Sequence, residues 1–206
     1  MSNLENKLKK IVNTFNNIDK NLAYEDIKKL STKYHKNINV LNVLSQIAQK
    51  MGDIDTTINS LKKILLLDKS NIECISKIYK LLLTKSLLDE ALANINLILR
   101  IDKDHYEAIR DKAYIYFLKN NFDKAKKYID NISKLEENDF FAYNIKGLIY
   151  FKNSNFHEAK NYFEQAIKIN SKYVDSYNNL GVCLMELEKL DEAFTIFKKA
   201  QEIDSN

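Results

Sequence analysis

The chain has 206 residues, of which 45% are apolar, and its 32 basic and 28 acidic side chains give a formal net charge of +4. This balance is typical of soluble globular proteins. Only three Gly, no Pro and no Trp occur. Such a composition favours helices and leaves few residues for tight turns and hairpins, so it disfavours an all-β or a dinucleotide-binding fold.

The first 20 residues mix charged and apolar residues without the apolar core of a secretory signal, so we expect no secretory signal there. No apolar run approaches the roughly 18 residues of a membrane span. We therefore expect a cytoplasmic protein with no membrane contact. Residues 1–103 carry 17 basic and 11 acidic side chains, whereas residues 104–206 carry 15 and 17. Because no basic run exceeds two residues, we expect no nucleic-acid partner.

A period of 34 residues runs through the chain from residue 4. In rows of this length, five of the twelve alanines fall at position 20, where only the second row differs, with Thr57. A fixed period of this size is typical of stacked repeats. The rows define six repeats: 4–37, 38–71, 72–105, 106–139, 140–173 and 174–206.

Each repeat contains two amphipathic helical patterns. In its second half, positions 20, 24 and 27 are small or apolar, and this spacing puts them on one helix face. In its first half, position 8 is small in the last repeats, as at Gly147 and Gly181, between large residues at positions 4 and 11. Small residues at positions 8 and 20 allow the two helix axes to approach closely. The first repeat differs, since its apolar set Leu4, Leu8, Ile11 and Phe15 indicates a helix rotated by about one residue.

Acidic and polar residues mark where the second helix of each repeat begins and ends. Position 18 is often Asp, at residues 55, 89, 123 and 191, and we expect these side chains to cap the second helix. Pairs such as Leu67-Asp68, Ile101-Asp102 and Ile169-Asn170 predict its end. Because no Pro follows, the helices could run on by some residues.

Residues 141–170 and 175–204 resemble the tetratricopeptide repeat, with a large, small, large pattern in the first helix and Ala, aromatic, Ala in the second. The resemblance covers essentially the whole chain, although the Pro common near the end of such repeats is absent. It implies an all-α fold, an α-solenoid of six helix-turn-helix repeats in a right-handed superhelix, as one array over residues 1–206. It also implies a concave groove lined by the first helices, where peptides bind.

Catalytic signatures are missing from the sequence. The three Gly residues are isolated, and no phosphate-binding or paired-cysteine motif occurs. His35, His105 and His157 fall near expected helix ends, where exposed or capping roles are usual. Cys74 and Cys183 are interpreted as small buried residues. We therefore expect no enzymatic activity, no metal and no cofactor.

The flank of the first helices is the surface on which we expect a partner. Positions 2, 5, 9 and 12 form a strip roughly 120° from the direction of the core. This strip is polar in the second and third repeats and largely apolar or aromatic in the last three. The alternative is that its aromatic residues pack on neighbouring helices. The candidate partner-binding residues are seven apolar or aromatic residues and three polar anchors: Tyr114, Phe117, Phe141, Leu148, Phe151, Val182 and Met185, with Arg110, Asn144 and Asn178.

The last repeat is expected to leave Phe194 and Phe197 uncovered. Either the chain is a fragment of something longer, or this face binds a second copy and forms a homodimer. The sequence thus predicts a non-enzymatic protein-protein interaction scaffold that binds a peptide or helix of another protein in the groove of the last three repeats. Two alternatives stay open: a structural module that joins subunits of a larger complex, and a regulatory domain cut from an enzyme.

Overall fold

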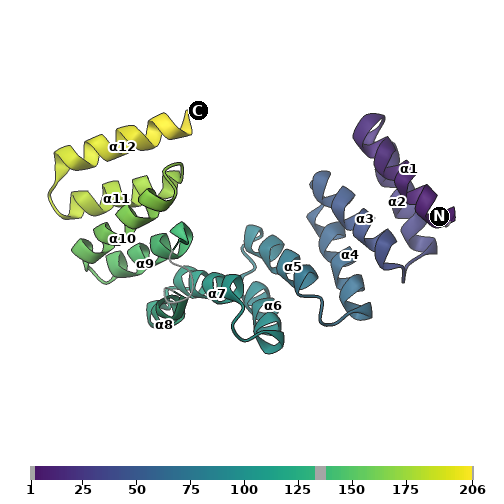
Figure 1. The fold of residues 1–206 in the computed structure, drawn as a ribbon, viewed down its shortest axis with the longest axis horizontal. Helices are drawn as coiled ribbons and strands as arrows, with labels where there is room; N and C mark the ends of the chain where they lie inside the picture. Colours follow the sequence, from purple (N-terminus) through teal and green to yellow (C-terminus); the bar gives the residue numbers. More distant parts are fainter. Residues whose placement is uncertain (1–2, 133–137, 206) are drawn as a thin grey trace. The chain divides into compact units, whose positions relative to one another are not determined.

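The computed structural model describes residues 3–132 and 138–205, which form twelve α-helices and no strand (Figure 1). Consecutive helices pack as six antiparallel pairs, which confirms an all-α solenoid of six helix-turn-helix repeats. The helices are α1 (Asn3–Asn17), α2 (Lys20–Lys33), α3 (Ile38–Lys50), α4 (Ile54–Leu67), α5 (Ile72–Thr84), α6 (Leu88–Ile101), α7 (Tyr106–Leu118), α8 (Phe122–Ile132), α9 (Phe140–Lys152), α10 (Phe156–Ile169), α11 (Val174–Glu186) and α12 (Leu190–Asp204).

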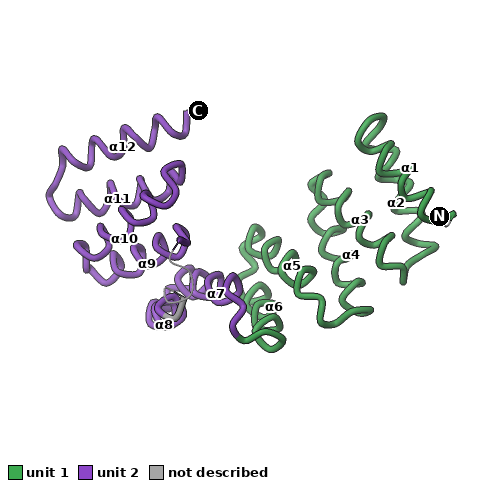
Figure 2. The backbone as a smooth tube through the Cα atoms, viewed as in Figure 1, with its two compact units in different colours: residues 1–103 green, residues 104–206 purple. Residues whose placement is uncertain are grey.

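The chain consists of two compact units, residues 1–103 with α1 to α6 and residues 104–206 with α7 to α12 (Figure 2). Within each unit, the second helix of one pair packs against the first helix of the next. The prediction that all six repeats form one continuous array stays a prediction. Within the described residues, no helix combines the length and apolarity that crossing a membrane requires.

The core of each repeat is built from the columns that the period defines. The five alanines of position 20 are at most 2% exposed, and the large residues of position 24 are buried from Ile27 in α2 to Phe163 in α10. In α1 the buried residues are Leu8, Ile11 and Phe15, which confirms the rotated first helix. Burial of these apolar side chains holds each helix pair together.

Two glycines allow the closest approach between paired helices. A Cβ atom on Gly147 of α9 would lie 2.5 Å from the ring of Phe163 in α10, and a Cβ on Gly181 of α11 would lie 2.5 Å from the ring of Phe197 in α12. In these two repeats, the glycine at position 8 therefore makes room for the aromatic ring at position 24. This corrects the expectation for Phe197, whose ring is partly covered because it packs on Gly181.

The turn inside five of the six helix pairs has one geometry. Position 15 adopts a left-handed backbone, with φ between 56° and 78°. In α5, for example, Ser86 N donates to Leu83 O and Leu87 N donates to Leu82 O, both at 2.9 Å. This is the Schellman pattern that ends a helix and satisfies its last carbonyls. The five position-15 residues are Gly52, Ser86, Asn120, Ser154 and Glu188.

The second helices begin differently from the prediction. Asp55, Asp89 and Asp191 lie in the first turn of α4, α6 and α12 and make no cap. The α4 cap is Asp53, which accepts a hydrogen bond from Thr56 N at 2.9 Å. The acidic residues at position 18 thus lie where the helix dipole favours a negative charge, and Asp55 also pairs with Lys85 Nζ at 2.6 Å.

The predicted ends of the second helices are confirmed for three repeats. Helices α4, α6 and α10 end at Leu67, Ile101 and Ile169. These helices do not continue beyond those residues even though no Pro follows, because the next residue, Asp or Asn, adopts an extended backbone conformation.

Candidate functional site

The candidate site is a small pocket on the first helices of unit 2. Helices α7, α9 and α11 contact one another in series, and a hollow of about 200 Å³ opens on them. The i, i+3, i+4 and i+7 spacing on α9 and α11 aims the lining side chains in one direction. Five of the ten predicted partner-binding residues lie here, together with three others: Tyr114, Phe141, Asn144, Leu148 and Asn178, with Tyr173, Asp175 and Asn179.

Asn144 forms the buried base of this pocket. Its side chain is 3% exposed, and its Oδ1 accepts hydrogen bonds from Ser176 Oγ at 3.1 Å and Asn179 Nδ2 at 3.0 Å. These bonds join α9 to α11. The carbonyl oxygen of Asn144 is therefore used inside the protein, and among the predicted polar anchors Asn178 is the exposed one.

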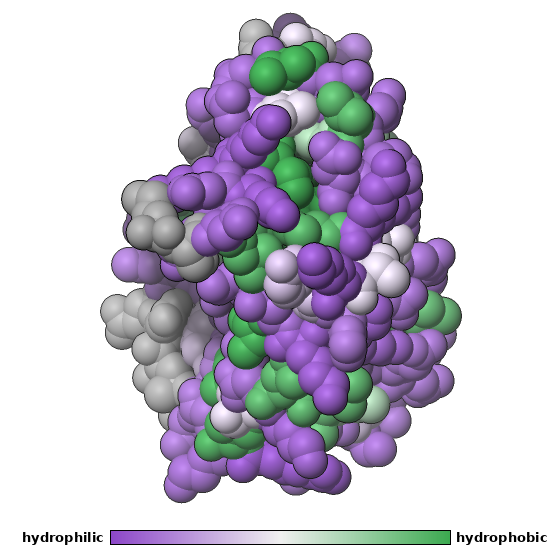
Figure 3. Space-filling model, turned by 90° about the vertical axis from the view of Figure 1, so that its right-hand side faces the viewer, coloured by the Kyte–Doolittle hydropathy of each residue, from purple (hydrophilic) through white to green (hydrophobic). Residues whose placement is uncertain are grey.

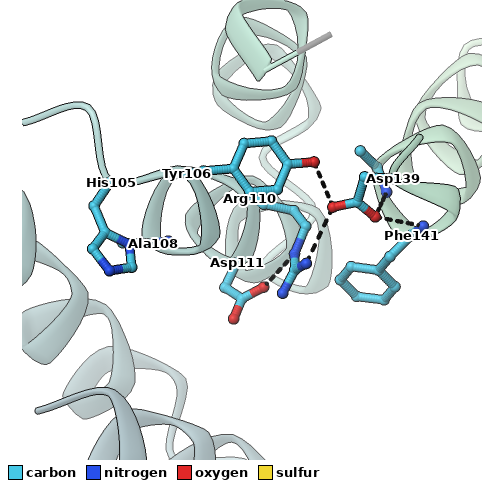
Figure 4. Close-up of polar contacts among 8 residues, drawn as sticks. His105, Tyr106, Ala108, Arg110, Asp111, Asp139 and Phe141 are labelled. Atoms are coloured by element: carbon cyan, nitrogen blue, oxygen red, sulfur yellow. Dashed lines mark hydrogen bonds and ion pairs between the residues drawn. The ribbon is translucent and has the colours of Figure 1, made fainter. Parts of the chain in front are cut away.

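Arg110 belongs to an ionic network at the edge of the site (Figure 4). Its Nε donates to Asp111 Oδ1 at 2.9 Å and its Nη1 donates to Asp139 Oδ2 at 3.1 Å. Tyr106 OH donates to the same Asp139 oxygen at 2.5 Å. The other oxygen of Asp139 accepts from the backbone N of Phe141 at 2.8 Å and caps α9.

The network fixes charges as well as positions. Burial acts to raise the pKa of Asp139, but hydrogen bonds from Tyr106, from the α9 backbone and from Arg110 outweigh it and hold that pKa below its ordinary value. Burial acts to lower the pKa of Arg110, and its pairing with Asp111 and Asp139 raises it instead. The guanidinium also lies 5.1 Å from the ring centroid of Phe141. Arg110 thus braces the aromatic wall of the pocket.

The aromatic rings of the pocket form a connected wall. Tyr114 and Phe141 meet edge to face with their centroids 5.2 Å apart. Burial and the charge of Asp175 raise the pKa values of both Tyr114 and Tyr173. Tyr114, Tyr173 and Asp175 all line the hollow, so the carboxylate lies close enough to act on both phenol groups.

Besides Arg110, four predicted partner-binding residues lie outside the pocket lining. Phe117 and Phe151 pack on Phe122 and Phe156, the first residues of the next helices, with centroids 5.7 Å and 5.3 Å apart. These two rings follow the packing alternative. Val182 and Met185 are 43% and 51% exposed on α11.

Three residues of the pocket were missed as candidates. Tyr173 precedes α11 and has no place in the strip. Asn179 is one residue away from the strip on α11. Asp175 stands at position 2 of its repeat, which is one of the four positions of the strip, so the sequence alone could have identified it as a candidate.

The histidines and cysteines fit the predicted structural roles. His105 Nδ1 accepts a hydrogen bond from Ala108 N at 3.3 Å and caps α7 (Figure 4), while His35 and His157 are exposed. Cys74 and Cys183 are buried, unpaired thiols. Burial raises the pKa of Cys183 to about 11, so this thiol is protonated at neutral pH. Among the described residues, no group of three potential ligands could hold a metal ion.

Comparison with known proteins links this arrangement to one family. Residues 146–206 match the family model of the tetratricopeptide repeat. No curated protein matches the chain.

Several solved structures share the fold. A tetratricopeptide repeat protein from Parabacteroides merdae is 19% identical with a TM-score of 0.81, over 96% of this chain and 78% of that chain. MamA is 23% identical with a TM-score of 0.66, over 82% of this chain and 92% of that one. YrrB, described as a protein of this repeat class with an unusual peptide-binding site, is 17% identical with a TM-score of 0.62, over 89% and 94%. At these identities the similarity establishes the fold.

Proposed function

We propose a function on the premise that the chain is a tetratricopeptide repeat protein. This premise rests on the family match over residues 146–206 and on the fold. Proteins of this class mediate protein-protein interactions. We propose that this one is a non-enzymatic scaffold that binds a segment of a partner protein on α7, α9 and α11. A cytoplasmic location stays a prediction, to be tested by localising the native protein.

The observation that carries the proposal is the lining of the pocket. Aromatic side chains supply apolar contact area, and exposed polar groups of Asp175 and Asn178 stand beside them. A few fixed polar groups in an aromatic hollow give a bound segment its register and direction. The buried bonds of Asn144 hold α9 and α11 in place before the partner arrives, which lowers the entropy cost of binding.

The charge of the pocket favours a cationic side chain on the partner. Asp175 is exposed beside the two tyrosines, whereas the only arginine nearby, Arg110, is already paired with Asp111 and Asp139. A lysine or arginine of the partner would meet the carboxylate and the faces of the aromatic rings together.

Peptide selection followed by mutation tests the proposal. Peptides selected from a random library on the wild-type protein are measured by fluorescence anisotropy against the double variant Asp175→Ala/Asn178→Ala, whose two sites are exposed. We expect at least a tenfold loss of affinity. The matched control, Asn161→Ala/Asp191→Ala, changes the same residue types at exposed sites on α10 and α12 and should stay within twofold. Equal binding by all three proteins would exclude this pocket.

A second candidate function is self-assembly through α12. Leu190 and Phe194 are 64% and 72% exposed on this helix, and large exposed apolar side chains are typical of contact surfaces. Light scattering of the wild type beside Phe194→Glu tests this function. A concentration-dependent mass that the substitution abolishes would support assembly, and two identical monomers would exclude a homodimer at this face.

A further inference from the structure

A second groove lies in unit 1, far along the sequence from the pocket of α7, α9 and α11. It runs between α1 and α2 with a volume of about 330 Å³. Lys7 and Lys10 stand on its α1 wall, Lys29 and Lys33 stand on its α2 wall, and Asp26 is the one acidic residue of the lining. The groove therefore carries four positive charges against one negative charge.

The floor of this groove is apolar. Ile11 of α1 is 8% exposed, and Leu30 of α2 is partly buried against the core of the first repeats. Figure 3 views the chain from the side that carries α1 and α2 in Figure 1, and apolar atoms form a narrow strip there between hydrophilic ones. An apolar strip between charged ridges is the form of groove that receives an amphipathic helix.

The four lysines of the groove form no ion pair within the described residues, whereas several other lysines of the chain do. Lys77, for example, pairs with Glu73 at 2.6 Å and Lys160 pairs with Glu164 at 2.8 Å, both at i, i+4 spacing. In the described residues, none of the four groove lysines has an acidic group within ion-pair distance.

The spacing of the lysines places like charges beside each other on each wall, and Asp26 offsets them only in part. Lys7 and Lys10 are three residues apart on α1, and Lys29 and Lys33 are four residues apart on α2. Like charges at these spacings repel each other and destabilise a helix. An acidic partner would relieve this repulsion on both walls at once, so the charge arrangement favours binding over stability.

We propose that the groove between α1 and α2 binds an acidic amphipathic helix of a partner protein. Apolar residues of that helix at i, i+3 or i+4 and i+7 would lie on Ile11 and Leu30, and carboxylates on its two flanks would pair with the four lysines. The partner differs in charge from the segment proposed for the pocket of unit 2, so the protein would hold two unlike segments at separate sites.

A designed peptide tests this proposal. The probe is a fluorescein-labelled 18-residue helical peptide with a leucine stripe flanked by glutamates, measured by fluorescence anisotropy at low and high salt. The protein variant replaces Lys7, Lys10, Lys29 and Lys33 with Gln. Its control replaces Lys62, Lys63, Lys69 and Lys103 with Gln, four exposed lysines of the same unit. We expect the first variant to bind about tenfold more weakly, a change of about 1.4 kcal/mol, and the control to stay within twofold.

Two altered probes separate the contributions to binding. A peptide with lysines in place of its glutamates should not bind, and a peptide with serines in place of its leucines should lose most of its affinity. Binding should also weaken at high salt because mobile ions screen the charge pairs. Thermal unfolding checks the fold, and the groove variant should melt no lower than the wild type because repulsion is relieved.

Three outcomes would overturn the proposal. Equal losses in the two quadruple variants would show attraction to net charge alone. Full binding of the serine peptide would exclude the apolar floor. Tight binding to phosphatidylserine vesicles without binding to the acidic helix would assign the lysines to a membrane surface instead.

Discussion

Replacement of Gly147 by Ala should destabilise the protein, although Gly to Ala changes inside helices usually stabilise. The new Cβ would lie 2.5, 2.6 and 2.9 Å from three ring carbons of Phe163, whereas carbon contacts prefer about 3.5–4.0 Å. The ring is 1% exposed and must retreat by about 1 Å, which separates α9 from α10.

The size of the effect follows from two opposing contributions. Overpacking of a core costs about 1–3 kcal/mol, and the higher helix propensity of Ala returns about 1 kcal/mol. Because the new contacts are as short as 2.5 Å, the overpacking cost falls in the upper part of that range, and we expect the free energy of unfolding to fall by about 1–2 kcal/mol. For a chain of this size that corresponds to a melting temperature lower by about 2–8 °C.

The fourth repeat provides the compensating partner for this test. It carries Ala113 and Ile129 at the two positions that Gly147 and Phe163 hold in the fifth repeat. The double variant Gly147→Ala/Phe163→Ile should therefore be more stable than the sum of the single changes predicts, by about 1 kcal/mol. Urea unfolding followed by circular dichroism measures all four proteins. A stabilised Gly147→Ala protein, or strictly additive effects, would refute the packing argument.

Three further substitutions test other features of the fold. Gly52→Ala should cost about 1 kcal/mol through backbone strain alone, because φ is 78° and no atom lies within 4 Å of the new Cβ; a neutral melting temperature would contradict this. Asn144→Ala removes the acceptor of one buried and one partly buried donor and should cost about 1–3 kcal/mol in urea unfolding, and an unchanged stability would show that water replaces it freely. Asp139→Asn should lower stability at pH 7 by about 1–3 kcal/mol and flatten the acid limb of a stability profile. Because the pKa of Asp139 is lowered in the folded protein, its contribution is complete above the ordinary value of 3.8 and is lost as the pH falls through the folded pKa. Parallel acid limbs for variant and wild type would remove Asp139 from that role.

The repeat columns could be recognised in the sequence because each requires one kind of side chain, apolar or small, at a fixed spacing. Periodic burial of apolar residues gives the twelve helices, and small residues at positions 8 and 20 indicate close helix pairs. The column of position 15 was equally visible, but its members Gly52, Ser86, Asn120, Ser154 and Glu188 share a backbone conformation and no side-chain chemistry. A pattern of residue types does not show such a conformation.

The candidate site was predictable only in part. The strip placed Tyr114, Phe141, Asn144, Leu148 and Asn178 on one face because helix geometry alone determines that face. Helix geometry does not determine which polar groups pair with each other. Asp139 stands 29 residues from Arg110 and Ser176 stands 32 residues from Asn144, and these long-range bonds decide which groups are left for a partner.

The common geometry of the five turns has a consequence for how such a chain changes in length. Because every one of these turns starts the second helix at the same point of its row, a gain or loss of a whole row of 34 residues keeps every helix at its own position within a repeat. A single residue inserted within a helix would instead rotate the rest of that helix by about 100° and bring polar side chains into the core. Growth by whole helix pairs therefore keeps the repeats in register, and duplication of one row, such as residues 140–173, is the smallest extension of this kind.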